Sequence, residues 1–218
     1  MAKFFGNLSD QIDFDQLLEN LKPGYQETFY AFDAEGNIPS DISLEDLEYV
    51  TKVHSAGYKD PICNDMLFYP YHHFDETLVY QLDKIFGAVC NMCWIIRTVP
   101  GRVTIPHQDY DDREQILEKY GTIVRFHIHI SRPSIGHVFV LKDHAHHMEA
   151  QGNCYEWDHH TDWHSVSNSS FTNQYILGYR GIIPHPEHRH RFEDYDYIWN
   201  DTVESVRIKI KKPVRVII

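Results

Sequence analysis

The spacing of hydrophobic residues changes near residue 87. Before it, apolar positions recur at helical spacing and predict three helices, one capped by Ser9, one capped by Ser43 and one over residues 76–86. After it, short runs rich in β-branched and aromatic residues are separated by turn residues, which is typical of strands. The predicted strands cover residues 89–99, 122–130, 137–141, 155–157, 165–167, 175–179 and 206–210, and a further short strand ends at Pro106.

This succession of short strands predicts a mainly β fold. Several antiparallel strands within about 120 residues are typical of a sandwich or jelly roll. We divide the chain into a helical or irregular N-terminal buttress, residues 1–64, and a β domain, residues 65–218. The buttress is expected to pack against the β domain rather than to fold alone.

Composition narrows the classes of partner. The net charge of −12 disfavours nucleic acid, because phosphate backbones attract Lys and Arg. No apolar run approaches the ~20 residues that a membrane helix needs, and the first residues turn polar too soon for a signal peptide. We therefore expect a cytoplasmic protein with no membrane partner. The four cysteines, among them Cys90 and Cys93, are expected to be buried and reduced.

The sixteen histidines are the unusual feature of the composition, because they offer many metal ligands. An Fe(II) site for O₂ chemistry uses two histidines and one carboxylate, and residues i and i+2 of an extended chain can reach one ion. His-x-Asp occurs three times, beginning at His73, His107 and His160. The first precedes a predicted helix and the third lies in a polar turn. Only the pair of His107 and Asp109 follows a predicted strand, with His164 as a downstream third ligand.

Residues 124–130 alternate strictly between polar and apolar. Arg125, His127 and His129 share one face of the predicted strand. That face either meets water, as in a half-buried strand, or lines the interior of a barrel. In the second case Arg125 could hold a carboxylate through a charge-assisted pair of hydrogen bonds, and His127 could donate to the same ligand.

Four motifs in order resemble the aspartyl/asparaginyl β-hydroxylase family, which includes free-proline hydroxylases. They are Pro-Gly at residue 100 followed by Pro-His-x-Asp at residue 106, Arg-x-His-Ile-x-Ile at residue 125, Gly-Asn-Cys-Tyr-Glu-Trp at residue 152, and His-x-Val-x-Asn at residue 164. The resemblance covers about residues 98 to 180. It does not extend to the first 90 residues.

The resemblance implies a fold, a reaction and residue roles. Family members are 2-oxoglutarate-dependent oxygenases on a double-stranded β-helix, a cupin-like jelly-roll barrel, here with N-terminal helices packed against it. His107, Asp109 and His164 would be the iron ligands. Arg125 and His127 match positions that contact co-substrate or substrate.

One departure from the family concerns the anchor of 2-oxoglutarate. The family has an arginine ten residues after the last histidine, where this chain has Gln174. Glutamine can hydrogen-bond a carboxylate but cannot neutralise it. Arg180 has the same strand parity but lies about 20 Å further along an extended chain, so it replaces the anchor only if the strand bends or bulges. Arg125 and Arg97 are the other candidates.

The sequence therefore predicts an Fe(II)- and 2-oxoglutarate-dependent dioxygenase that uses O₂ to hydroxylate an amino-acid side chain. The substrate is a peptide Asp or Asn, or a free amino acid. The alternative is a metal-binding cupin-type protein without this activity, which the missing arginine favours. The histidine clusters at residues 143–147 and 185–191 are interpreted as polar loops.

Overall fold

The computed structural model describes residues 3–21, 25–28, 65–70, 76–108, 118–158, 161–191, 195–198 and 208–211. The helices are α1 (Phe14–Glu19), α3 (Glu76–Phe86) and the 3₁₀ helix η3 (Pro186–Arg191). The strands are β1 (Lys3–Asn7), β2 (Tyr25–Thr28), β3 (Asp65–Pro70), β4 (Val89–Thr98), β5 (Arg102–His107), β6 (Gly121–His129), β7 (His137–Leu141), β8 (His144–His147), β9 (Asn153–Trp157), β10 (His164–Asn168), β11 (Gln174–Pro184), β12 (Tyr195–Ile198) and β13 (Ile208–Lys211). No helix among these residues is long and apolar enough to cross a membrane.

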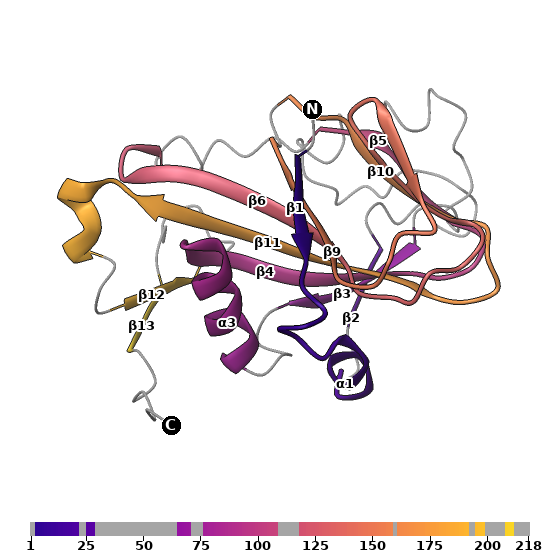
Figure 1. Ribbon diagram of the computed structural model, residues 1–218, viewed down its shortest axis with the longest axis horizontal. Coiled ribbons are helices and arrows are strands. Elements are labelled where there is room, and N and C mark those ends of the chain that lie inside the picture. Colours follow the sequence, from indigo (N-terminus) through magenta and orange to yellow (C-terminus); the bar gives the residue numbers. More distant parts are fainter. Residues whose placement is uncertain are drawn as a thin grey trace, which may run out of the picture.

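The strands form two large layers. A seven-stranded sheet has the order β1-β9-β6-β11-β4-β3-β2, and a four-stranded sheet has the order β5-β10-β7-β8. A separate pair joins β12 and β13. In Figure 1, α1 and α3 lie on one side of the large sheet, and β5 and β10 lie on the other. The large sheet is therefore the middle layer of three.

Each face of the large sheet contributes to its own hydrophobic cluster. The helix-side cluster joins Leu78 and Leu82 of α3 to residues such as Phe126 and Tyr179 of the sheet. Phe86 stacks on Phe126 with ring centroids 3.8 Å apart. The second cluster lies between the two sheets and consists of Phe139, Leu141, Tyr155, Trp157, Val166 and Ile176. This second cluster forms the floor of the candidate site.

The burial of strand β6 distinguishes between the two interpretations of its polar face, contact with water or contact with a barrel interior. Phe126 and Ile128 are buried on the helix side, and Arg125, His127 and His129 are also buried, at 4%, 4% and 6% exposure. The polar face therefore meets the space between the sheets and not water. The barrel-interior interpretation is the one that agrees with this burial.

The N-terminal segment differs from the prediction. The first residues form β1, which pairs with β9 at the edge of the large sheet, although no strand was predicted there. The first helix begins at Phe14, with Asp13 as its N-cap accepting from the Gln16 N–H, so the expected cap at Ser9 is wrong. The Ser9 hydroxyl instead donates to the carbonyl of Gln151, 2.7 Å away.

Of the other expected elements, some are confirmed, some are wrong and some lie outside the described residues. The helix over residues 76–86 and the strand over residues 137–141 are confirmed at both ends. The helix capped by Ser43 and the domain boundary near residue 64 lie outside the described residues, and the two-part division stays a prediction. The histidine clusters expected to be loops include β8 and η3, so that interpretation is wrong for both.

The fold class is confirmed as mainly β. Among the described strands, no hydrogen-bonded ladder joins the two large sheets. The described strands therefore form two separate sheets that pack on each other, with helices on one side. Closure into a double-stranded β-helix stays a prediction. The expected reduced cysteines are confirmed for Cys90, Cys93 and Cys154, which are free and buried.

Candidate functional site

The candidate site begins where β10 begins. His164 is the first residue of this strand and is 7% exposed. Its backbone is paired with His107, the last residue of β5, on one side and with Leu141, the last residue of β7, on the other. The register of the small sheet thus brings two of the three expected metal ligands to facing positions. The side chain of His107 and the whole of Asp109 lie outside the described residues.

An ion pair between a buried carboxylate and a partly exposed lysine holds the turn that precedes His164. Lys142 Nζ lies 2.8 Å from Asp162 Oδ1, and the other carboxylate oxygen accepts from the Asp158 N–H at 3.2 Å. The Lys142 N–H also donates to the Trp163 carbonyl. Burial would raise the pKa of Asp162, but the hydrogen bonds from Lys142 and Asp158 outweigh it and lower that pKa. The aspartate of the third His-x-Asp motif is therefore part of a structural turn, as its polar context indicated.

The large sheet faces His164 with aromatic rings. The His164 ring centroid lies 4.5 Å from that of Trp157 and 5.9 Å from that of His127. The Arg125 guanidinium lies over the same Trp157 ring, with its carbon 5.5 Å from the ring centroid. Trp157 therefore lies between Arg125, His127 and the last expected ligand, His164. The contact of Arg125 and His127 with co-substrate or substrate stays a prediction.

A second buried arginine adjoins Arg125. Arg180 of β11 is 2% exposed and is the cross-strand partner of Arg125. The pairing of β11 with β4 runs without a register shift from Gln174 to Arg180, and its shift comes only after Arg180. No bulge therefore returns Arg180 to the place of Gln174, and an anchor at Arg180 would hold a co-substrate further along the strand. We call this region, with Arg125, His127, Trp157, His164 and Arg180, the arginine end.

Arg97 does not belong to this end. Its partner across the ladder is Tyr175, which packs against the helix-side cluster. Cys93 and Ile95 of the same strand belong to that cluster, and alternate residues of a strand share one face. Arg97 therefore points away from the space between the sheets, and the structure removes it from the candidate anchors.

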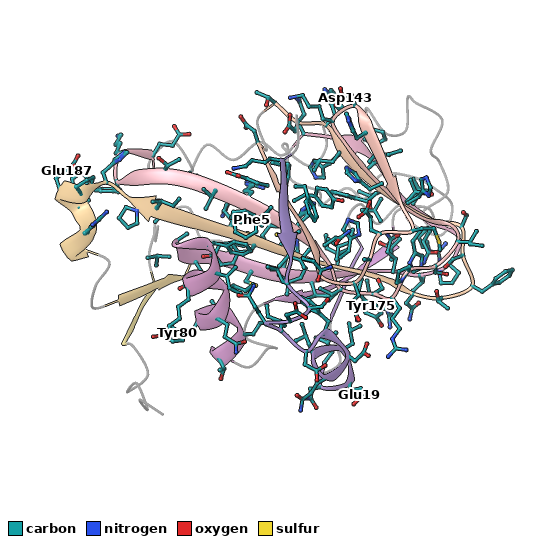
Figure 2. All side chains as sticks on the ribbon, in the orientation of Figure 1. Phe5, Glu19, Tyr80, Asp143, Tyr175 and Glu187 are labelled. Carbon is teal, nitrogen blue, oxygen red and sulfur yellow. The ribbon has the colours of Figure 1, made fainter. Side chains whose placement is uncertain are left out.

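A pocket of about 740 Å³ opens beside the arginine end. Arg125 and Trp157 lie on its wall together with the ion pair of Lys142 and Asp162. The Lys142 backbone has a positive φ of 60°, an uncommon conformation for a residue other than glycine. Figure 2 labels its neighbour Asp143, which marks the turn between β7 and β8. Of the arginine end, Arg125 and Trp157 reach this pocket.

The opposite end of the same space is built differently. Gln174, the first residue of β11, is 3% exposed and shares a small cavity with His129, His137, His146 and Glu149. We call this region the histidine end. Among the described residues of the cavity wall, the one arginine is Arg132, which is ion-paired with Asp15 and whose side chain is 77% exposed.

Glu149 is fixed at the histidine end by two hydrogen bonds. Its Oε2 accepts from Asn153 Nδ2 at 2.6 Å and from the Tyr155 hydroxyl at 2.7 Å. Burial would raise the pKa of Glu149, but these hydrogen bonds prevail and lower it. Burial lowers the pKa of His129 to about 4. At neutral pH this end therefore combines a neutral imidazole with an ionised carboxylate.

The expected site residues thus divide between two places. His164, Arg125, His127 and Arg180 come together at the arginine end, with His107 facing His164 through the register of the small sheet. Gln174 lies at the histidine end. The sequence analysis gave no role to Trp157, which contacts both His127 and His164, although it ends the third motif of the resemblance. It also missed Glu149, which no motif marks.

Within the residues that the structure describes, no three His, Cys, Asp or Glu side chains are already placed to hold a metal ion. That search does not include Asp109 or the side chain of His107. The chemistry of the expected iron site therefore depends on one described ligand, His164, and on the backbone position of a second.

No protein-family model and no curated protein match this chain. Among solved structures it is similar to a prolyl hydroxylase from Trichoplax adhaerens in complex with a hypoxia inducible factor peptide, at 12% identity and a TM-score of 0.43, over 84% of this chain and 92% of that one. It is similar to a Pseudomonas putida prolyl-4-hydroxylase at 11% identity and a TM-score of 0.41, over 78% and 100%. It is also similar to a predicted oxalate decarboxylase from Thermotoga maritima at 12% identity and a TM-score of 0.33, over 54% and 81%. Likenesses at this level carry no argument about activity.

Proposed function

We propose that this protein is an Fe(II)- and 2-oxoglutarate-dependent dioxygenase that hydroxylates an amino-acid side chain, in a peptide or in a free amino acid. One observation supports this most. The antiparallel register of β5 and β10 sets His107 opposite His164, on a sheet whose packing partner carries the buried Arg125 and Arg180. The expected histidine ligands and the buried arginines thus belong to sheets that pack on each other.

The donor set fits Fe(II). Directly opposite residues of an antiparallel pair have Cβ atoms about 4.5–5.5 Å apart, which suits two imidazoles on one ion. Asp109 follows His107 by two residues and completes a ligand set of two histidines and one carboxylate. When bound, iron with 2-oxoglutarate and O₂ supplies the oxidant for C–H hydroxylation.

The arginine end would bind the carboxylate groups. Guanidinium groups hold carboxylates in bidentate fashion, and buried ones do so in a medium that strengthens the attraction. Arg180 is the proposed anchor of the distal carboxylate of 2-oxoglutarate, in place of the arginine missing at Gln174. Arg125, stacked on Trp157, and the neighbouring His127 would orient that group or the substrate.

The apolar cluster between the sheets would keep this chemistry dry. Phe139, Leu141 and Ile176 are buried in this cluster at 0%, 0% and 2% exposure. A reacting centre placed over such a floor is separated from bulk water, which limits side reactions. The pocket on the open side admits the substrate, and the ion pair of Lys142 and Asp162 keeps the strand that carries His164 in position.

The test is succinate formation from 2-oxoglutarate without a prime substrate. Purified protein receives Fe(II), ascorbate and air, beside His164→Ala and a matched control, His144→Ala, at an exposed position. We expect slow turnover in the parent and in the control and none in His164→Ala. Turnover that persists in His164→Ala would refute the assignment of the metal ligands.

The second candidate is a metal-binding cupin-type protein without 2-oxoglutarate oxygenase activity. The observation that favours it is the environment of Gln174, which shares its cavity with the carboxylate of Glu149. A carboxylate ligand would be repelled there. If the protein supplied with Fe(II) shows no turnover and the Mn(II)-loaded protein shows no calorimetric binding of 2-oxoglutarate, this second candidate becomes the better account.

A further inference from the structure

We propose that the histidine end is a second metal site, in which a divalent transition-metal ion is bound by the Nε2 atoms of His129 and His146 and by Oε1 of Gln174. The site uses none of the ligands assigned to iron above. It therefore stands or fails independently of the proposed oxygenase activity.

The first support is a set of buried polar atoms that lack partners. His129 Nε2, His146 Nε2 and Gln174 Oε1 are each buried, with no hydrogen-bond partner in the part of the chain that the structure describes. His129 and Gln174 are only 6% and 3% exposed. An unsatisfied buried polar group costs about 1–3 kcal/mol, and native proteins contain few of them. Three around one small cavity indicate that a ligand belongs there.

The second support is the orientation of His146. Its Nδ1 lies 3.4 Å from Glu149 Oε1, so the carboxylate favours a proton on Nδ1 and leaves a lone pair on Nε2. Glu149 is itself fixed through Oε2 by Asn153 and Tyr155. A carboxylate that orients a histidine through its second ring nitrogen is the usual surrounding of a metal-binding imidazole.

The third support is the chemistry of the cavity wall. Two imidazole nitrogens, an amide oxygen and an adjacent anionic carboxylate all offer electron pairs, which favours a cation. Imidazole ligands suit zinc, copper, iron and nickel, whereas calcium and magnesium prefer oxygen alone. The free space of about 10 Å³ has room for one water or one ion and for no larger ligand.

The competing occupant is an ordered water, which could bridge the same atoms. The two occupants differ in one measurable respect, because a water requires no metal. The site contains two histidines rather than three among the described ligands, so solvent would complete the coordination. We therefore expect a weaker site than a closed structural zinc centre.

The experiment measures Zn(II) and Co(II) binding in the His164→Ala background, which lacks the proposed iron site. After removal of metal with a chelator and dialysis against each ion, the bound metal is counted by elemental analysis and the affinity is measured by calorimetry. The background is compared with added His129→Asn and His146→Asn. A matched control carries His144→Asn and His147→Asn, at exposed positions of the same strand as His146.

We expect one ion per chain in the background and in the control, and at least a tenfold loss of affinity in His129→Asn and in His146→Asn. Co(II) should show visible absorption bands that vanish with the same two variants. Glu149→Gln, which keeps the metal-binding atoms, should weaken binding about 10–100-fold. Equal binding in the background and both asparagine variants, or loss of binding in the control alone, would overturn the proposal and leave a water or surface histidines as the explanation. If His129→Asn fails to fold, His146→Asn and Glu149→Gln decide the question.

Discussion

The arginine end and the histidine end share a strand and a face but differ in charge. Arg125 and His129 are four residues apart on β6, about 13 Å along the strand, and both point between the sheets. Arg125 has a second cation beside it because β11 supplies Arg180. His129 has an anion nearby because the segment after β8 supplies Glu149. The character of each end is thus decided by strands that are distant in sequence, and an anion and a cation should be drawn to opposite ends.

Substitution of the buried Arg180 should have the greatest effect on the affinity for 2-oxoglutarate. We expect Arg180→Met to weaken 2-oxoglutarate binding about 30-fold to 5,000-fold, because loss of a buried charge partner costs about 2–5 kcal/mol. Gln174→Met, at the opposite end, should change this affinity less than threefold. Calorimetric titration of the Mn(II)-loaded proteins measures both, and Arg180→Lys tests whether charge alone suffices. A larger loss in Gln174→Met than in Arg180→Met would return the anchor to the histidine end.

Acid should lower the stability of the metal-free protein through His129 at the histidine end. The folded-state pKa of His129 is lowered from 6.5 to about 4, so between these values the unfolded chain binds more protons than the folded one. Stability should therefore fall as the pH is lowered from about 6.5 to about 4, by about 3 kcal/mol for this group. Urea unfolding at several pH values, in the presence of a chelator, measures the slope. His129→Gln should flatten it, and an unchanged slope would show that His129 is not the group responsible.

Two sequence-level predictions succeeded because they concern local patterns. The helix over residues 76–86 has an apolar stripe and a glycine beyond its end, and its bounds match. Strand β7 matches as well. In such elements the spacing of apolar residues along the chain predicts which face will be buried.

The failures concern partners that lie far away in sequence. Strand β1 is short and mostly exposed, and it is a strand because β9 offers it an edge. Ser9 has the residue type of a helix cap, but its hydroxyl bonds to Gln151 instead. The role of the polar face of β6 could not be chosen from its alternation, since water and a barrel interior require the same pattern. The environment of Gln174 depends on Glu149, which only the fold brings near.

Disruption of the turn before His164 should have a moderate effect on stability and on activity. We expect Asp162→Ala to destabilise the protein by about 1–3 kcal/mol, because it removes a nearly buried acceptor from Lys142 and from the Asp158 N–H. Activity should fall with it, since the position of His164 is set by this turn. Thermal unfolding and succinate formation measure the two effects. Lys142→Ala is the milder control, because the lysine side chain is 39% exposed.

Exposed histidines of the small sheet should matter least. His144→Asn should change the free energy of unfolding by less than about 0.5 kcal/mol, because its side chain is 53% exposed and its close contact is to the exposed Asp143. His146→Asn, two residues further on, should cost more because it faces Glu149 in the cavity. Urea unfolding of the two variants side by side checks this. Equal costs would mean that the contact of His146 with Glu149 adds no stability.

The pairing of β1 with β9 also bears on how the chain folds. Residues 3 and 156, which are joined by an ion pair, are 153 positions apart, so the outermost ladder of the large sheet closes one of the longest loops in the protein. Contacts of such separation form late, because the chain entropy lost on closing the loop must be offset by structure already in place. During synthesis β1 emerges first, and its partner follows only after most of both sheets has been made. Until then the outer edge of β9 is open, and a second nascent chain could add its own β1 there, exchanging strands between two molecules.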